Sequence, residues 1–268
     1  MSAAERGALP ATEENPSEPR WDDLSHERCP DARLAGLELA ALARASEVVA
    51  VVDTRWAVAT VGMWLERPYH DPVRQSADGM ADCRTPVSVC AWTRDAHGGV
   101  RRVGPVLNNL EPDTVAETLV ELAAVALRGG GPDTVCVVAV QRFLALEATV
   151  LARVNPADHT VVLRACWGLA EWLGETLYFD EWRARGDGTV TESLILLKPT
   201  ATFAALGGTE TVDIAPRLRS TPVLDIGLVR ALTLHAFAVA AALSGPCELT
   251  FGLWTGRVLL LSCVPVER

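Results

Sequence analysis

Lysine is almost absent from this chain of 268 residues, because Lys198 is the only lysine among 24 basic side chains. The chain also has no cluster of basic residues, and its 34 acidic side chains give a formal net charge of −10. Nucleic acids and anionic membrane surfaces attract proteins with an excess of positive charge. The composition therefore excludes both as the main partner, and it leaves phosphate chemistry with a single ammonium group.

Targeting and disulfide signals are missing as well. Residues 1–20 contain no apolar core of the kind that a signal peptide needs. The longest apolar run, at residues 231–243, is too short to cross a bilayer. The seven cysteines form no Cys-x-x-Cys pair, which indicates reduced and mostly buried thiols. We therefore expect a soluble, cytoplasmic protein without a membrane partner.

Several common catalytic motifs do not occur. The glycine run at residues 129–131 lacks the Gly-Lys-Ser/Thr ending of a P-loop, so a loop that ends a helix is the simpler interpretation. The sequence has no His-Glu-x-x-His pattern for zinc and no Gly-x-Ser-x-Gly nucleophile motif. His235 lies in an apolar helix pattern that favours a core residue. These patterns by themselves predict no catalytic site.

What is present is an ordinary globular composition, with 49% hydrophobic and 22% charged residues. Residues 1–30 are rich in Glu, Pro, Ser and Ala and predict a disordered tail, and residues 67–85 predict a loop. We expect helices at residues 32–44, 56–64, 112–127 and 225–243, and a helical turn at 169–174. We expect strands at residues 48–52, 87–92, 100–106, 134–143, 148–154, 160–165, 176–183, 189–198, 247–253 and 257–264. Mixed helices and antiparallel hairpins indicate the α+β class.

Four stretches of the second half occur in an order that is typical of one enzyme family. Residues 141–156 are followed by Ala-Cys-Trp-Gly-Leu-Ala-Glu at residues 165–171, and a strand that ends at Lys198 comes next. Glu-Leu-Thr-Phe at residues 248–251 then precedes a turn and the apolar run at residues 258–265. This order resembles the ATP-binding domain of the phosphoenolpyruvate synthase and pyruvate phosphate dikinase family.

The resemblance implies an ATP-grasp fold over most of the chain. Two lobes, at residues 31–133 and 134–268, would hold ATP between them, and a histidine of a separate protein would accept the phosphoryl group. The resemblance also implies that Trp167 is buried beside a tight turn at Gly168. The helix at residues 225–243 would cover the last two strands.

The resemblance places neutral side chains where the family has charged ones. The opening lysine of the family falls near Ala35, the arginine of its Val-Arg-Ser-Ser strand falls on Cys90, and its Mg²⁺-binding glutamate falls on Thr250. The glutamine and the arginine of its Gln-Ala-Arg-Pro motif fall on Ser262 and Val264. Phosphoryl transfer depends on positioning and on neutralisation of charge. These replacements predict a degenerate domain, or pseudoenzyme.

The candidate site residues follow from the same resemblance. The candidate nucleotide-binding residues are Gln141, Arg142, Phe143, Leu144 and Glu171. The first four form the segment whose main chain would meet adenine, although polar side chains that merely cover a strand edge are the alternative. Arg94, four residues after Cys90, is the candidate phosphate ligand. Glu248 is the candidate Mg²⁺ ligand, because a shift of two residues from Thr250 keeps the same face of a strand.

Three functions remain open at this point. The first is a nucleotide-binding or regulatory subunit without catalysis, which assists a phosphotransferase-type protein partner. The second is the active ATP-binding subunit of a split phosphotransferase, in which Glu171 and Glu248 hold Mg²⁺ while Arg94 and Arg142 hold the phosphates of ATP. The third is a small-molecule binder that uses the same cleft, which the neutral replacements make more apolar.

Overall fold

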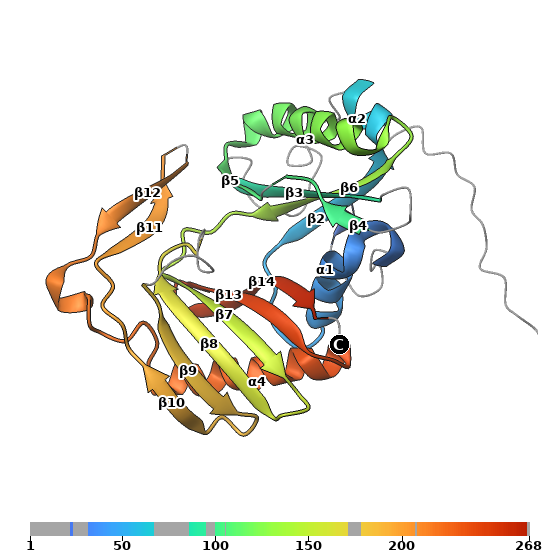
Figure 1. The fold of residues 1–268 in the computed structure, drawn as a ribbon. Helices are drawn as coiled ribbons and strands as arrows, with labels where there is room; N and C mark the ends of the chain where they lie inside the picture. Colours follow the sequence, from blue (N-terminus) through green and yellow to red (C-terminus); the bar gives the residue numbers. More distant parts are fainter. Residues whose placement is uncertain are drawn as a thin grey trace, which may run out of the picture.

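The computed structural model describes residues 22–23, 32–66, 86–94, 100–104, 106–170, 178–206 and 208–266. These residues form two antiparallel six-stranded sheets, a separate two-stranded hairpin and four α-helices (Figure 1). One sheet lies in the upper part of Figure 1 and the other in the lower part, and each has a helix on its outer side. The predicted α+β class with two lobes is thereby confirmed.

The upper sheet forms the N-lobe. Its strands, in spatial order, are β1 (Asp22–Asp23), β2 (Thr54–Thr60), β6 (Val135–Arg142), β3 (Val87–Arg94) and β4 (Val100–Arg102), and β5 (Leu107–Leu110) also pairs with β3. Helices α2 (Val61–Glu66) and α3 (Val115–Gly130) cover its outer face. The 3-10 turn η2 (Pro112–Thr114) leads into α3, whose buried face includes Leu119 and Leu122. This apolar face forms one core with the sheet.

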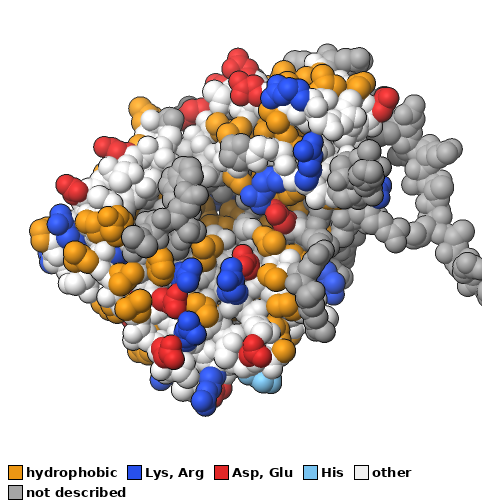
Figure 2. Space-filling view, in the orientation of Figure 1, with side chains coloured by type: hydrophobic (Ala, Val, Ile, Leu, Met, Phe, Trp, Pro, Cys, Tyr) orange, Lys and Arg blue, Asp and Glu red, His pale blue; other side chains and the backbone are white. Residues whose placement is uncertain are grey.

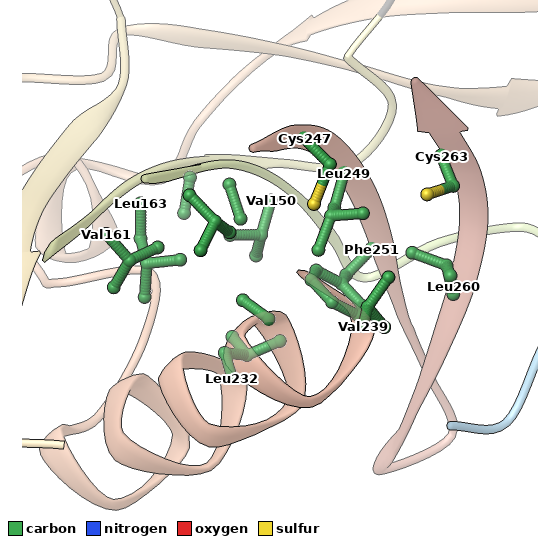
Figure 3. Packing of buried hydrophobic residues seen from close by; sticks show 14 of the residues in the cluster. Val150, Val161, Leu163, Leu232, Val239, Cys247, Leu249, Phe251, Leu260 and Cys263 are labelled. Atoms are coloured by element: carbon green, nitrogen blue, oxygen red, sulfur yellow. The ribbon is translucent and has the colours of Figure 1, made fainter. Parts of the chain in front are cut away.

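The lower sheet forms the C-lobe. Its strands, in spatial order, are β10 (Val190–Leu194), β9 (Asp180–Arg185), β8 (Thr160–Trp167), β7 (Ala148–Asn155), β13 (Cys247–Trp254) and β14 (Arg257–Pro265). Helix α4 (Ile226–Leu243) begins where the Asp225 carboxylate accepts a hydrogen bond of 2.8 Å from the amide of Leu228. Figure 3 shows Leu232 and Val239 of α4 facing the apolar side chains of the sheet. Helix α4 packs against β7, β8, β9 and β13, whereas β14 packs mainly against α1 (Ala32–Ala45). The prediction that this helix covers the last two strands is therefore confirmed only for β13.

Helix α1 (Ala32–Ala45) lies between the lobes, because it packs against β14 and α4 on one side and against β3, β4 and β6 on the other. The chain that follows it joins the edge of β14. The amide of Val52 donates to the Leu260 carbonyl at 3.0 Å, and the amide of Leu260 donates to the Ala50 carbonyl at 2.8 Å. The lobes are also joined by the segment 143–147, which connects β6 to β7.

The hairpin of β11 (Thr200–Ala205) and β12 (Gly208–Asp213) stands at the left of Figure 1 and reaches from the C-lobe to the N-lobe. At its base, the amide of Leu169 donates to the Thr202 carbonyl at 2.7 Å. At its tip, the side-chain amide of Asn109, in the N-lobe, donates to the carbonyls of the last residue of β11 and the first residue of β12. The hairpin is therefore held by both lobes.

Lys198 lies in the C-lobe core and is 1% exposed. Its ammonium nitrogen is 2.5 Å from an oxygen of Asp180, which is fully buried. Asp180 also accepts hydrogen bonds from the amides of Leu196 at 3.0 Å and Val223 at 2.8 Å. Because a buried ion pair needs further hydrogen bonds to offset its desolvation, this arrangement ties together three segments that are distant in the sequence.

Two local predictions in the N-lobe are wrong. Most of the helix expected at residues 56–64 is strand β2, which pairs with β6 along its whole length. Pairing in a sheet outweighs a weak local helix preference. The strand expected at residues 48–52 is a turn followed by a single bridge between Val51 and Leu260.

The expected boundary between the lobes, at residues 133 and 134, lies one strand too early. Strand β6 pairs with β2 and with β3, so it is an inner strand of the N-lobe sheet. The chain changes sheets only in the segment 143–147. Sequence spacing does not reveal this, because both partners of β6 are far away in the sequence.

The predicted turn at Gly168 is confirmed by its φ of +69°, which favours glycine. Trp167 is only partly buried, at the edge of the C-lobe core. The hairpins predicted at residues 176–198 and 247–264 form as β9–β10 and β13–β14, although the first is shorter than expected. The predicted loop at residues 67–85 and the predicted tail at 1–30 lie outside the described residues, apart from strand β1, where we expected none.

Candidate functional site

A cavity of about 780 Å³ lies between the two lobes. In Figure 2 the surface is hollowed between the upper and lower parts of the molecule, with apolar side chains inside and charged ones at the rim. Its lining comes from both sheets, from α1, from the interlobe segment and from the hairpin, and includes Leu39, Ser88, Cys90, Ala139, Gln141, Leu144, Leu146, Thr149, Gly208, Thr250, Leu261 and Ser262. A volume of this size suits a small organic ligand or a nucleotide.

Both walls of the cavity carry apolar and polar side chains. The N-lobe wall includes Cys90 and Ala139 beside the polar Ser88, and burial raises the pKa of the Cys90 thiol to about 12. The C-lobe wall includes Leu146 and Leu261 beside side chains with neutral hydroxyl groups. Thr250 and Ser262 face each other across the β13–β14 pair, and the hydroxyl of Thr149 donates to the Gly168 carbonyl at 2.7 Å.

Charged side chains line the cavity at two places. Glu38 of α1 forms an ion pair with Arg102 of β4, and its carboxylate also accepts a hydrogen bond of 3.3 Å from the indole of Trp92. At the second place, the guanidinium of Arg142 lies 5.2 Å from the ring centre of Trp254. Its Nη1 is 4.0 Å from an oxygen of Asp53. The buried Nε of Arg142 has no hydrogen-bond partner within the described part of the chain.

The predicted adenine segment, residues 141–144, lines the cavity as a whole. The side-chain amide of Gln141 is used within the protein, because it donates at 3.2 Å to the Leu261 carbonyl of the other lobe. The amides of Arg142 and Phe143 also have protein acceptors, at 2.9 Å and 3.0 Å. Leu144 is buried. The segment therefore comprises the end of β6 and the start of the interlobe segment 143–147, and its role in adenine binding stays a prediction.

The other predicted ligands lie away from the cavity or outside the described residues. Arg94 is exposed at the end of β3 and does not line the cavity. Glu248 shares the strand face of Thr250, as predicted, but its carboxylate accepts hydrogen bonds of 2.8 Å and 2.5 Å from Arg153. Glu171 lies outside the described residues. Within the ranges that the structure describes, no group of three or more His, Cys, Asp or Glu side chains is placed to hold a metal ion.

Three features of the site were not predicted. Glu38 and Arg102 come together only because α1 packs against the N-lobe sheet, and neither residue belongs to a motif. Asn109 has a φ of +57°, a conformation in which asparagine is enriched, but the Asn-Asn pair at 108–109 is a weak signal by itself. Ser88 donates to the side-chain oxygen of Asn108 at 2.8 Å, which holds that part of the lining in place.

No known protein family and no curated protein matches this sequence. Among solved structures, it is similar to the ATP-grasp ligase PsnB complexed with its minimal precursor, with 13% identity over 84% of this chain and a TM-score of 0.32. It is also similar to the D-alanine–D-alanine ligase of Bacillus anthracis complexed with ATP, with 12% identity over 82% of this chain and a TM-score of 0.34. The chain spans 50% of the length of each structure. At these values, membership of the phosphoenolpyruvate synthase family stays a prediction.

Proposed function

We propose that this chain is an ATP-grasp-like domain whose interlobe cavity binds a nucleotide without transferring its phosphate, and that it serves as a regulatory subunit of a phosphotransferase-type partner. One observation carries the proposal. Cys90, Thr250 and Ser262 come from three different strands and line one cavity. These are the positions at which the family resemblance expects an arginine, a metal-binding glutamate and a glutamine.

The chemistry of these positions favours binding over catalysis. A triphosphate in transfer needs cations or a metal ion beside its oxygens. The three side chains are neutral at pH 7, since the pKa of the Cys90 thiol is about 12. Lys198 is bound to Asp180 in the C-lobe core, and Glu248 is paired with Arg153. The apolar part of the lining, which includes Leu39, Ala139 and Leu261, suits a planar base better than it suits a phosphate chain.

Calorimetric titration of the purified chain with ATP, ADP and adenosine, each with and without Mg²⁺, tests this proposal. We expect the three compounds to bind with similar affinity and without dependence on Mg²⁺, because recognition rests on the base. Micromolar binding of ATP that requires Mg²⁺ would contradict the proposal. Absence of heat with all three compounds would rule out a nucleotide as the ligand of the cavity. A thermal-shift panel of apolar metabolites would then test whether the cavity binds another kind of small molecule.

Two substitutions on the same face of β13 test whether any binding takes place in the cavity. Thr250→Phe places a large side chain in the cavity and should abolish binding. Glu248→Gln changes a side chain two residues away that does not line the cavity, so it should leave binding unchanged. Loss of binding in Glu248→Gln would instead support the predicted metal site.

A second candidate, the active ATP-binding subunit of a split phosphotransferase, is favoured by one observation. Arg102 and Arg142 both line the cavity and bring two guanidinium groups to it, which can bind phosphate oxygens. In this case ATP and Mg²⁺ would bind, and Arg142→Gln would lower any ATP turnover by at least tenfold. Failure to detect turnover in the presence of candidate histidine-bearing partners would contradict this second function.

A further inference from the structure

Helix α4 carries few polar side chains, even on the side that faces away from the C-lobe sheet. Arg230 is the only residue with a permanent charge among its 18 residues. The helix is long and apolar enough to cross a membrane by composition, yet only 33% of it is buried in the protein. Leu234 and Ile226 are 54% and 53% exposed. A surface helix normally carries charged residues on its outer side, whereas a helix that is hydrophobic all round is normally covered.

The side of α4 that points away from the C-lobe sheet has a regular composition. We call it the outer α4 face, and it consists of Gly227, Ala231, Leu234, Ala238, Ala241 and Ala242. These residues recur at spacings of three and four, on the opposite side from the buried residues Leu232, Ala236 and Val239. Small residues allow another helix to approach closely. The outer α4 face is therefore shaped for a helix.

We propose that the outer α4 face binds the outer α4 face of a second copy of this chain, with the two helices antiparallel. We place the two-fold axis at the point between Leu234 and His235. Rotation about that point brings Ala231 opposite Ala238 and Gly227 opposite Ala242, so small residues meet on both sides of the axis. Leu234 of each copy then lies beside the axis, next to His235 of the other copy. A two-fold interface requires this kind of self-complementarity, because residue i contacts residue j and residue j contacts residue i.

The charges at the ends of the helix suit the same arrangement. Exposed Asp225 caps the N-terminal end. At the C-terminal end, the guanidinium of Arg44 donates to the Ala242 carbonyl at 3.0 Å. Antiparallel packing brings Asp225 of one copy to the end at which the other copy holds Arg44, and the two-fold axis repeats this contact. The helix dipoles also oppose each other, which is the favourable orientation.

The size of the face sets the expected strength. At 1.5 Å per residue, a helix of 18 residues is about 27 Å long. A contact of this length and one helix in width covers roughly 300 Å² on each copy, less than the ~800 Å² of a standard interface. We therefore expect a weak, reversible dimer, rather than an obligate one.

Crosslinking tests the position of the axis. Leu234→Cys should give a disulfide-linked dimer when oxidised glutathione is added, because the two copies of residue 234 lie beside the axis. Glu192→Cys, on the exposed edge strand β10, is the matched control and should stay monomeric. The chain without either substitution shows any background from its own cysteines. Equal crosslinking at the two positions, or none at residue 234, would overturn the proposal.

Sedimentation equilibrium of the unmodified chain, over about 1 to 100 µM, tests the affinity. Leu234→Arg should raise the dissociation constant at least tenfold, and circular dichroism checks that this exposed substitution leaves the fold intact. Arg44→Glu should raise it severalfold through repulsion from Asp225. A chain that stays monomeric at the highest concentration overturns the proposal. The proposal is also overturned if Leu234→Arg and Arg44→Glu both leave the association unchanged. Binding of the outer α4 face to neutral lipid vesicles, without self-association, would overturn it as well.

Discussion

The two lobes are built in the same way on their outer sides and differently on the sides that face each other. Each lobe has an antiparallel sheet whose outer face is covered by one long helix, α3 in the N-lobe and α4 in the C-lobe. Toward the cavity, each lobe presents a different mixture of side chains, with Cys90 and Ala139 in the N-lobe and Thr250 and Ser262 in the C-lobe. The outer faces therefore stabilise the lobes, whereas the inner faces form the lining of the cavity.

An ion pair in the C-lobe and an ion pair beside the N-lobe sheet differ in how far they are exposed to solvent. Lys198 and Asp180 are buried in the C-lobe, whereas Glu38 and Arg102 are partly exposed at the cavity. The same kind of bond therefore stabilises one lobe and borders the ligand site of the other. Four sets of substitutions test this comparison.

The largest effect is expected for Asp180→Ala. It leaves the Lys198 ammonium buried without a counter-charge and removes the acceptor of two backbone amides. We expect a loss of about 3–5 kcal/mol in the free energy of unfolding. Urea denaturation measures it, and Glu38→Gln is the matched control at less than about 1 kcal/mol. Equal losses for both would mean that burial does not distinguish the two pairs.

The next effect compares the two sides of α4. Leu232→Ala removes a side chain that is fully buried against the sheet, so we expect a loss of about 2–5 kcal/mol. Leu234→Ala, two residues away on the outer α4 face, should change the stability of the monomer by less than about 0.5 kcal/mol. Thermal denaturation at low protein concentration measures both. A large loss for Leu234→Ala would show that this face is already covered within one chain.

A smaller effect is expected for Gly168→Ala, at the base of the hairpin. A methyl group there would lie 2.1 Å from the Thr202 carbonyl oxygen, and the φ of +69° is unfavourable for alanine. We expect a loss of about 1–3 kcal/mol and faster amide hydrogen exchange in β11 and β12. Gly256→Ala has a similar φ and open space, so it separates backbone strain from the clash. Unchanged exchange in the hairpin would contradict this anchoring role.

The smallest effect is a pH dependence from buried thiols. Burial raises the pKa of Cys90, Cys136 and Cys166 from 9.0 to about 12. The folded state therefore keeps these protons at a pH at which the unfolded chain releases them. The contribution to stability is complete below pH 9 and is lost as the pH rises toward 12, with about 0.4 kcal/mol lost per thiol at pH 9. Denaturation between pH 7 and pH 9 measures it. Cys136→Ala should flatten the curve, and an unchanged curve would contradict the assignment.

Local patterns in the sequence were sufficient to predict the helices and hairpins whose contacts join residues that are close together in the chain. The helix at residues 225–243 and the hairpin at 247–264 were predicted close to their observed bounds, because a capping aspartate and a Thr-Gly turn act over a few residues. Strand β2 was missed, because only its pairing with β6 makes it a strand. The position of β6 itself depends on two distant partners, which no local pattern contains.

The residues predicted for the candidate site also fall into two groups, those that line the cavity and those that do not. The sequence resemblance pointed to residues 141–144 and to Cys90, Thr250 and Ser262, and these residues do line one cavity. It also pointed to Arg94 and Glu248, which do not line it. The pairing of Glu248 with Arg153 is a contact between neighbouring strands whose register the sequence does not specify.

The α+β class, the helix at residues 225–243, the turn at Gly168 and the scarcity of lysine for phosphate binding all follow from the sequence alone. Each of these depends on residue type and on spacing over a few residues. Only the tertiary structure decided that Lys198 is buried with Asp180, that Glu38 and Arg102 border the cavity, and that one side of α4 is left apolar and exposed. The physical reason is that burial and pairing depend on which distant segments pack together, and this is settled by the whole fold at once.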